Sequence, residues 1–139
     1  MAIQVETLSE FTWMQKLNPG TVQAFEASAS VVSYSPGTAI FCQDDPPTGL
    51  YILQSGRIKL CRQSRERIQI LALLMPGDWF GAESLPTDSL SPYTATTLTH
   101  AHCVYVAPRD LRKLLSSCPD LQETFLELTA ERLKQFVSL

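Results

Sequence analysis

Apolar positions follow a helical spacing at the beginning of the chain. The residues that recur are Leu8, Phe11, Met14 and Leu17. Asn18 and Pro19 come next, and this pair is typical of the N-cap and first turn of a helix. The sequence therefore predicts two short helices at the N-terminal end of the domain.

From about Val31 to Val106, short apolar or alternating runs are separated by turn residues. The runs are VVSY, TAIFC, GLYIL, RIKLCR, IQILALL, DWF, TATTL and CVYV. Gly37, Gly56 and Gly77 stand where tight turns require unusual backbone angles. Many short strands with regularly spaced turns are typical of an all-β sandwich or roll. We therefore expect a roll over about residues 30–107.

Helical spacing returns after the last of these runs. Pro108 opens a short helix, and Pro119 opens a longer one over about residues 119–139. The longer helix carries two apolar stripes, which are Leu121, Phe125 and Leu128, and Leu126, Ala130, Leu133 and Val137. One stripe is enough to dock a helix on its own domain, so the second predicts a homodimer interface. The alternative is a helix buried deep in the core.

Composition and charge restrict the possible functions. The 139 residues are 45% apolar and 18% charged, which is ordinary for one globular domain. The sequence has neither an apolar run long enough for a membrane span nor a secretory signal pattern, so we expect a cytoplasmic protein with no membrane partner. The net charge of -3 argues against DNA binding by this chain alone.

The basic residues are unevenly distributed. Five of the eleven lie between Arg57 and Arg67, with Glu66 among them. Mixed signs within a strand–turn–strand pattern predict a solvated hairpin. The alternative is a patch that contacts a partner.

Four stretches, in order, carry a resemblance to a known family. They are YSPGT from Tyr34, GLYILQSGRIKL from Gly49, PGDWFGAESL from Pro76 and YTATTLTHAHCVYVAPRDLRKLL from Tyr93. From about Phe11 to Leu139 the chain resembles the effector domain of the cyclic-AMP receptor protein and fumarate-nitrate regulator family. The resemblance implies an eight-stranded antiparallel jelly roll, or double-stranded β-helix, with short N-terminal helices and a long C-terminal dimerisation helix.

The resemblance also bears on the domain organisation. It implies a single effector domain over residues 1–139, without the helix-turn-helix domain that follows in the family. The sequence ends at Leu139 within a helical pattern and without a C-cap residue, which favours an excised or truncated domain. DNA would then be contacted only through the missing helix-turn-helix domain.

The resemblance further implies a ligand site, the phosphate-binding cassette of the family. The ligand-binding residues that it implies are Gly81, Ala82, Glu83, Ser84, Tyr93 and Thr94, with Arg132 from the long helix. In nucleotide-binding members the glycine admits backbone N–H groups to the phosphate, and the start of a short helix adds a favourable dipole. A glutamate follows that glycine and takes the ribose hydroxyl, and an arginine before a Ser/Thr-Ala pair takes the phosphate charge.

This sequence departs from the family at both of these positions. Ala82 follows the glycine, with the acid one place later at Glu83, and Tyr93 stands where the arginine is expected. A phenol can donate a hydrogen bond but cannot neutralise a phosphate. We therefore predict that cyclic AMP is not the ligand and leave the effector unidentified.

Arg132 admits two interpretations. No acidic residue lies three or four positions away on the helix, where an ion pair would form. A solvated, unpaired arginine is the interpretation that we favour. The alternative is a contact with an anionic ligand, as the resemblance implies.

The sequence gives little support for a metal site or a catalytic site. The cysteines are Cys42, Cys61, Cys103 and Cys118, scattered without metal-binding spacing and predicted to be buried or half-buried thiols. His100-Ala101-His102 invites a cupin-like metalloenzyme, but no acid follows before Asp110 and the pair falls where a turn is expected, so two solvated turn histidines are predicted. We expect no metal, no cofactor and no enzymatic activity.

The hypothesis that results is the ligand-sensing and dimerisation domain of a bacterial transcription regulator. One alternative is a stand-alone regulatory or scaffold module that binds a protein partner through the basic hairpin. A second is the cupin-like metalloenzyme.

Overall fold

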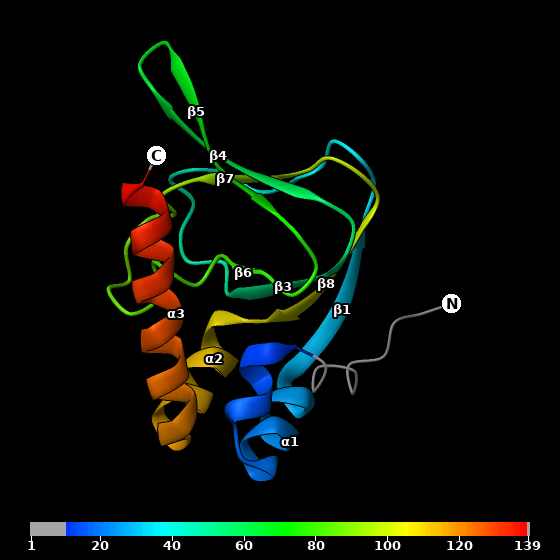
Figure 1. Cartoon of the computed structure of the whole chain (residues 1–139), viewed down its shortest axis with the longest axis vertical. Helices are drawn as coiled ribbons and strands as arrows, with labels where there is room; N and C mark the ends of the chain where they lie inside the picture. Colours follow the sequence, from blue (N-terminus) through cyan, green and yellow to red (C-terminus); the bar gives the residue numbers. More distant parts are fainter. Residues whose placement is uncertain (1–10, 139) are drawn as a thin grey trace.

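The computed structural model describes residues 11–138, which form a β-roll with helices at one end and along one side (Figure 1). The helices are η2, a 3-10 helix (Thr12–Lys16), α1 (Pro19–Ser28), α2 (Pro108–Ser117) and α3 (Pro119–Val137). The strands are β1 (Ala29–Tyr34), β2 (Ala39–Phe41), β3 (Leu50–Ser55), β4 (Ile58–Ser64), β5 (Arg67–Leu74), β6 (Trp79–Phe80), β7 (Thr94–Thr97) and β8 (Ala101–Val106).

The eight strands form two antiparallel four-stranded sheets. The strand order is β1-β8-β3-β6 in the first sheet and β2-β7-β4-β5 in the second. Each of the eight predicted runs contains one strand, so the predicted eight-stranded antiparallel jelly roll is confirmed. Leu8 lies outside the described residues, and the predicted first helix is the short η2.

Strand β3, in the interior of the first sheet, is buried on both faces over Leu50–Leu53, which explains why this stretch is apolar without alternation. Along β3, Leu50 and Ile52 point to the helices, whereas Tyr51 and Leu53 point into the roll. The helix-side cluster also contains Phe25 and residues of α2 and α3. The domain therefore has two apolar layers, one between helices and sheet and one between the two sheets.

Turn chemistry sets the ends of the strands as the sequence predicts. Gly37, Gly56 and Gly77 all have positive φ angles. At Gly56 the crowding is severe, because a Cβ atom there would lie 2.3 Å from the carbonyl oxygen of His100. Only glycine satisfies both the backbone angle and this close approach.

The N-terminal and C-terminal helices are joined by polar contacts. The side chain of Asn18 caps α1 by accepting the N–H of Thr21, as predicted. Asp120, in the first turn of α3, accepts the N–H of Asn18 at 2.9 Å and the hydroxyl of Thr21 at 2.7 Å. These hydrogen bonds lower the pKa of the Asp120 carboxyl. Asp120 therefore ties the start of α3 to the start of α1.

The two apolar stripes of α3 differ in their exposure to solvent. Leu121 and Phe125 are buried against the domain. Leu126, Leu133 and Val137 are 69%, 64% and 76% exposed. The second stripe is therefore not covered by its own domain, which overturns the alternative of a helix buried deep in the core.

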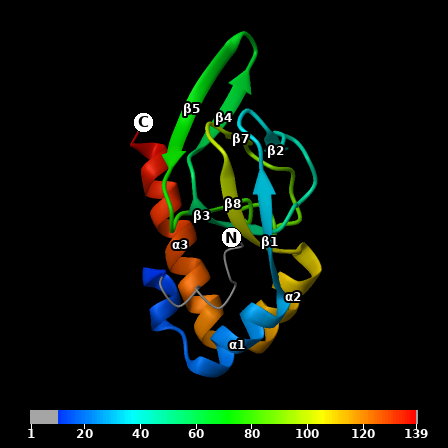
Figure 2. The same cartoon turned by 90° about the vertical axis from the view of Figure 1, so that its right-hand side faces the viewer.

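The β4–β5 hairpin extends away from the body of the roll (Figures 1 and 2). Its tip, including Arg65 and Arg67, is exposed, which confirms the predicted solvated hairpin. Ile68, Ile70 and Leu73 of β5 are exposed as well. Within residues 11–138, none of the helices has the length and apolar character needed to cross a membrane.

Candidate functional site

The segment after β6 turns sharply where it meets the rest of the roll. Gly81 has a φ of 95°, and a Cβ atom there would lie 2.8 Å from the carbonyl oxygen of Gly49 and 2.9 Å from the ring of Tyr51. A side chain at this position would therefore displace neighbouring backbone. The tight turn keeps the Gly81 N–H pointing toward Tyr93, to which it donates a hydrogen bond at 2.8 Å.

Tyr93, directly before β7, lies in the apolar space between the two sheets and is 0% exposed. Its ring packs between Phe41 of β2 and Phe136 of α3, with centroid distances of 5.7 and 6.2 Å. Ser91 donates a hydrogen bond to its carbonyl oxygen at 2.9 Å. The phenol thus lies in a fixed position in the interior.

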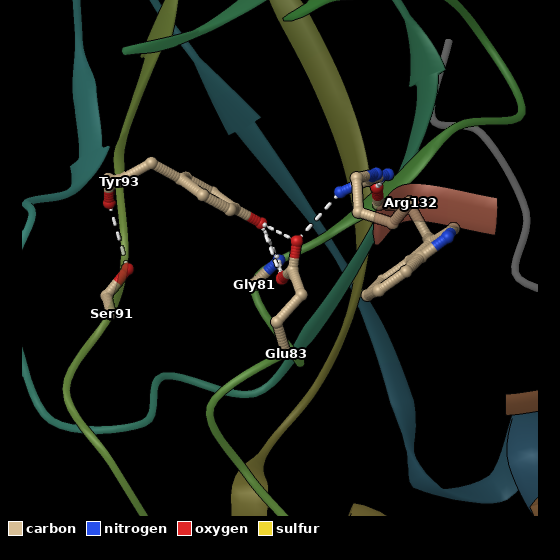
Figure 3. A network of polar contacts seen from close by, with 6 residues as sticks. Gly81, Glu83, Ser91, Tyr93 and Arg132 are labelled. Carbon is tan, nitrogen blue, oxygen red and sulfur yellow. Dashed lines mark hydrogen bonds and ion pairs between the residues drawn. The ribbon is translucent and has the colours of Figure 1, made fainter. Parts of the chain in front are cut away.

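The phenol hydroxyl of Tyr93 uses both of its hydrogen-bonding roles inside the protein. It accepts the Gly81 N–H, and it donates to the carboxylate of Glu83, whose Oε1 and Oε2 lie 2.6 and 2.7 Å away (Figure 3). Burial and the adjacent Glu83 carboxylate raise the pKa of Tyr93 well above its usual value. Tyr93 therefore remains a neutral donor over the physiological pH range.

Arg132 reaches the same carboxylate from α3. Its Nη1 atom lies 2.8 Å from Oε2 of Glu83, and the two side chains are only 6% and 16% exposed. Its Nη2 atom donates to the carbonyl oxygen of Trp79, and its guanidinium lies 4.3 Å from the centroid of the Trp79 ring. Each of these contacts compensates part of the cost of burying the charge.

The structure therefore contradicts the prediction that Arg132 is solvated and unpaired. The residue is 5% exposed, and its partner, Glu83, is 49 positions away in the sequence. The absence of an acid one helical turn away excludes only partners on the same helix. The packing of α3 against β6 and the following turn brings the two charges together.

The other ligand-binding residues that the resemblance implies are buried or already hydrogen-bonded within the protein. Ala82 and Ser84 are buried, and the hydroxyl of Thr94 accepts the N–H of Gln43 at 2.8 Å. The short helix expected after Gly81 is absent, because residues 83–88 form successive turns. Its dipole is therefore missing from the site.

A groove of about 850 Å³ opens on the outer side of this network. Glu83 and Pro86 form one wall, and α2 and the first half of α3 form the others. The lining includes Leu126, one of the exposed apolar residues of α3. The groove thus connects the carboxylate of Glu83 with the uncovered face of the long helix.

The predictions that the cysteines are buried or half-buried and that both histidines lie in a turn are partly wrong. Cys42 is exposed, against prediction, whereas Cys103 is buried and burial raises its pKa to about 12. His100 lies in the expected turn, but His102 belongs to β8, half-buried, with its Nδ1 atom 2.9 Å from the hydroxyl of Ser55. Among residues 11–138, no three His, Cys, Asp or Glu side chains gather where they could hold a metal ion.

Comparison with known proteins identifies the family. The sequence model described as "Cyclic nucleotide-binding domain" matches residues 31–118, more than half of the chain. The chain belongs to this family. The resemblance found in the sequence is thereby confirmed.

Two of the relatives in sequence are named as transcriptional regulators. The "CRP-like cAMP-activated global transcriptional regulator" of Mycobacterium tuberculosis is 28% identical over 131 residues, or 94% of this chain and 58% of that protein. The "HTH-type transcriptional regulator Cmr" of the same organism is 29% identical over 116 residues, or 84% of this chain and 48% of that protein. The chain thus spans about half the length of the curated relatives it matches.

Solved structures agree. The catabolite activator protein of Thermus thermophilus superimposes with a TM-score of 0.79 at 27% identity, over 88% of this chain and 58% of that one. The N-terminal domain of a transcriptional regulator from Streptomyces coelicolor gives a TM-score of 0.71 at 28% identity, over 88% of this chain and 89% of that one. The chain is an effector-type domain that resembles those of CRP-like transcription regulators.

The residues present do not fit the phosphate of a cyclic nucleotide as the family's cassette does. Tyr93 replaces the cation, and its hydroxyl is engaged by Gly81 and Glu83. Arg132, the buried cation of this network, is engaged by Glu83 and by the carbonyl oxygen of Trp79. A phosphate would also meet the negative charge of the Glu83 carboxylate.

Proposed function

We propose that this chain is the sensory and dimer-forming part of a transcription regulator, and that it does not respond to cyclic AMP. Family membership supports the regulator role, since the two relatives described above are named as transcriptional regulators. The domain is non-enzymatic, acts in the cytoplasm and contacts DNA only through a helix-turn-helix domain outside this sequence.

A single observation supports the proposal that the domain does not respond to cyclic AMP. The Tyr93 hydroxyl, at the position of the family's phosphate-binding arginine, is bonded to the Gly81 N–H and the Glu83 carboxylate. A cyclic nucleotide would have to break this network and place its phosphate beside a carboxylate. Charge-assisted hydrogen bonds contribute about 1.5 to 3 kcal/mol each, so losing the arginine alone weakens binding at least tenfold.

The dimer role rests on the outer stripe of α3. Leu126, Leu133 and Val137 are exposed and follow a coiled-coil spacing together with Ala130. A second copy of the same helix would cover all four residues by a two-fold contact. Such burial would remove a continuous apolar surface from water.

Isothermal titration calorimetry with cyclic AMP and cyclic GMP tests the proposal. We expect no saturable heat up to about 1 mM nucleotide, the range in which even a weak site binds. The cAMP-activated regulator of M. tuberculosis serves as the positive control. Saturable binding of either nucleotide by the wild-type protein would contradict the proposal, and loss of that binding in Glu83→Ala would place the nucleotide in this network.

A further inference from the structure

Three donors from separate parts of the fold converge on the Glu83 carboxylate. They are the Gly81 N–H at 3.1 Å, the Tyr93 hydroxyl at 2.6 Å and the Arg132 Nη1 atom at 2.8 Å. A backbone N–H, a neutral hydroxyl and a guanidinium around one anion form an oxyanion site. The anion that occupies it belongs to the protein itself.

We propose that Glu83 acts as a built-in ligand of this oxyanion site, so that α3 is held on the roll without an external effector. The site would then accept a small free carboxylate, such as formate or acetate, once the Glu83 side chain is truncated. The regulatory meaning of this inference rests on the proposed function, whereas the oxyanion site itself stands on geometry alone.

The location of each donor explains why the carboxylate holds the helix. Gly81 and Tyr93 belong to the roll, whereas Arg132 belongs to α3 and is 5% exposed. The carboxylate joins the donors of the roll to Arg132, in addition to the direct hydrogen bond from Arg132 to the carbonyl oxygen of Trp79 (Figure 3). Removal of the carboxylate therefore leaves a buried guanidinium with one carbonyl partner, and a phenol proton without an acceptor.

Access for a free anion is provided by the groove between α2 and α3. Glu83 forms part of its wall, so truncation of this side chain would extend the groove toward Tyr93 and Arg132. Formate and acetate are small enough to replace the lost carboxylate and carry the same charge. Chloride carries the charge but lacks the two oxygens that bridge the donors.

The test is chemical rescue of Glu83→Ala, followed as the Tm at constant ionic strength while formate replaces chloride. The substitution is expected to lower the Tm by about 10 °C, because it leaves a buried charge unpaired. Formate is expected to raise the Tm of this variant saturably, by about 4 °C at ten times its dissociation constant. Neither the wild-type protein nor Glu83→Ala/Arg132→Met should respond.

An equal response of all three proteins to formate, or no response of Glu83→Ala, would overturn the inference. If Glu83→Ala does not fold, the pair Glu83→Gln and Arg132→Gln replaces it. The inference then requires that the Tm of Glu83→Gln/Arg132→Gln be no lower than that of the less stable single variant. A loss of Tm in the double variant equal to the sum of the two single losses would contradict it. Nucleotide titration of the wild-type protein is independent of these results, so failure of the rescue leaves the proposed function in place.

Discussion

The inner and outer faces of α3 each depart from the usual distribution of polarity, because the inner face buries a charge and the outer face exposes apolar residues. The inner face, which packs on the domain, includes a charged residue, Arg132, beside Leu121 and Phe125. The outer face presents Leu126 and Leu133 to solvent. A surface helix normally buries its apolar residues and exposes its charges.

This difference shows that the two faces have separate tasks. The inner charge is satisfied within the chain by Glu83, so it fixes where α3 lies on the roll. The outer apolar residues are mostly exposed and are available to a second copy. Substitutions on the inner face should therefore change folding, whereas those on the outer face should change association.

The largest effect is expected from the apolar part of the inner face. Phe125→Ala removes a buried ring that packs on Trp79 at a centroid distance of 5.9 Å. The expected loss in the free energy of unfolding is about 3 to 5 kcal/mol. Leu126→Ala, one residue away on the outer face, is the control and should cost less than about 1 kcal/mol in the monomer. Urea denaturation of both variants measures the contrast, which fails if the two losses are equal.

The second-largest loss of stability is expected from removal of the charge on the inner face. Arg132→Met keeps most of the apolar volume but leaves the Glu83 carboxylate without its cation, at an expected cost of about 3 kcal/mol. Lys134→Met is the matched control, because Lys134 pairs with Glu131 at the exposed surface. Its expected effect in the same denaturation experiment is within about 0.5 kcal/mol. An Arg132→Met protein as stable as the wild type would show that the buried pair does not hold α3.

Tyr93→Phe should have a smaller effect, about 1 to 2 kcal/mol, because it removes one hydroxyl that bonds to Glu83 and Gly81. The substitution should also alter the pH dependence of stability. The folded-state pKa of Tyr93 is raised, so its contribution is complete below about pH 10 and is lost at higher pH, where the unfolded chain ionises first.

The loss should reach about 1.4 kcal/mol per pH unit above pH 10, and Tyr93→Phe should lack this component. Other buried groups with raised pKa values, such as Cys103, contribute to both proteins equally. The difference between the two proteins therefore isolates Tyr93. Identical slopes from pH 10 to 11 would contradict the buried hydrogen-bonded phenol.

The smallest effect on monomer folding is expected on the outer face. Leu133→Glu should change monomer stability by no more than about 0.5 kcal/mol, because the side chain is already exposed. It should nevertheless convert dimers to monomers in sedimentation equilibrium, since the charge would be buried in the helix pair. Gln135→Glu places the same charge on the same helix outside the stripe and should leave the dimer intact. A wild-type protein that is monomeric at all concentrations would contradict the dimer.

The roll could be predicted because its signals are local. Turn residues such as Gly56 and Gly77 separate the strands, and both carry the positive φ that they were expected to carry. The two stripes of α3 were also visible, because a helical spacing determines which residues share a face. The exposure of Leu126 and Leu133 follows from that spacing.

The polar network could not be predicted in the same way. The sequence shows that Tyr93 replaces a cation, but the partner of Tyr93 depends on how the turn after Gly81 approaches β7. The pairing of Arg132 with Glu83 depends on where α3 lies along the roll. Contacts across 49 positions are set by the packing of whole elements, which local spacing rules do not describe.

The hydrogen bonds of Asp120 gain a further meaning from the position of Arg132 on the same helix. Asp120 bonds the first turn of α3 to the start of α1, and Arg132 bonds the last third of α3 to the roll. The two attachments are about 18 Å apart along the helix axis. A helix held at two points can neither slide nor pivot as a whole, so a displacement transmitted through α3 must either break one of these two attachments or bend the helix.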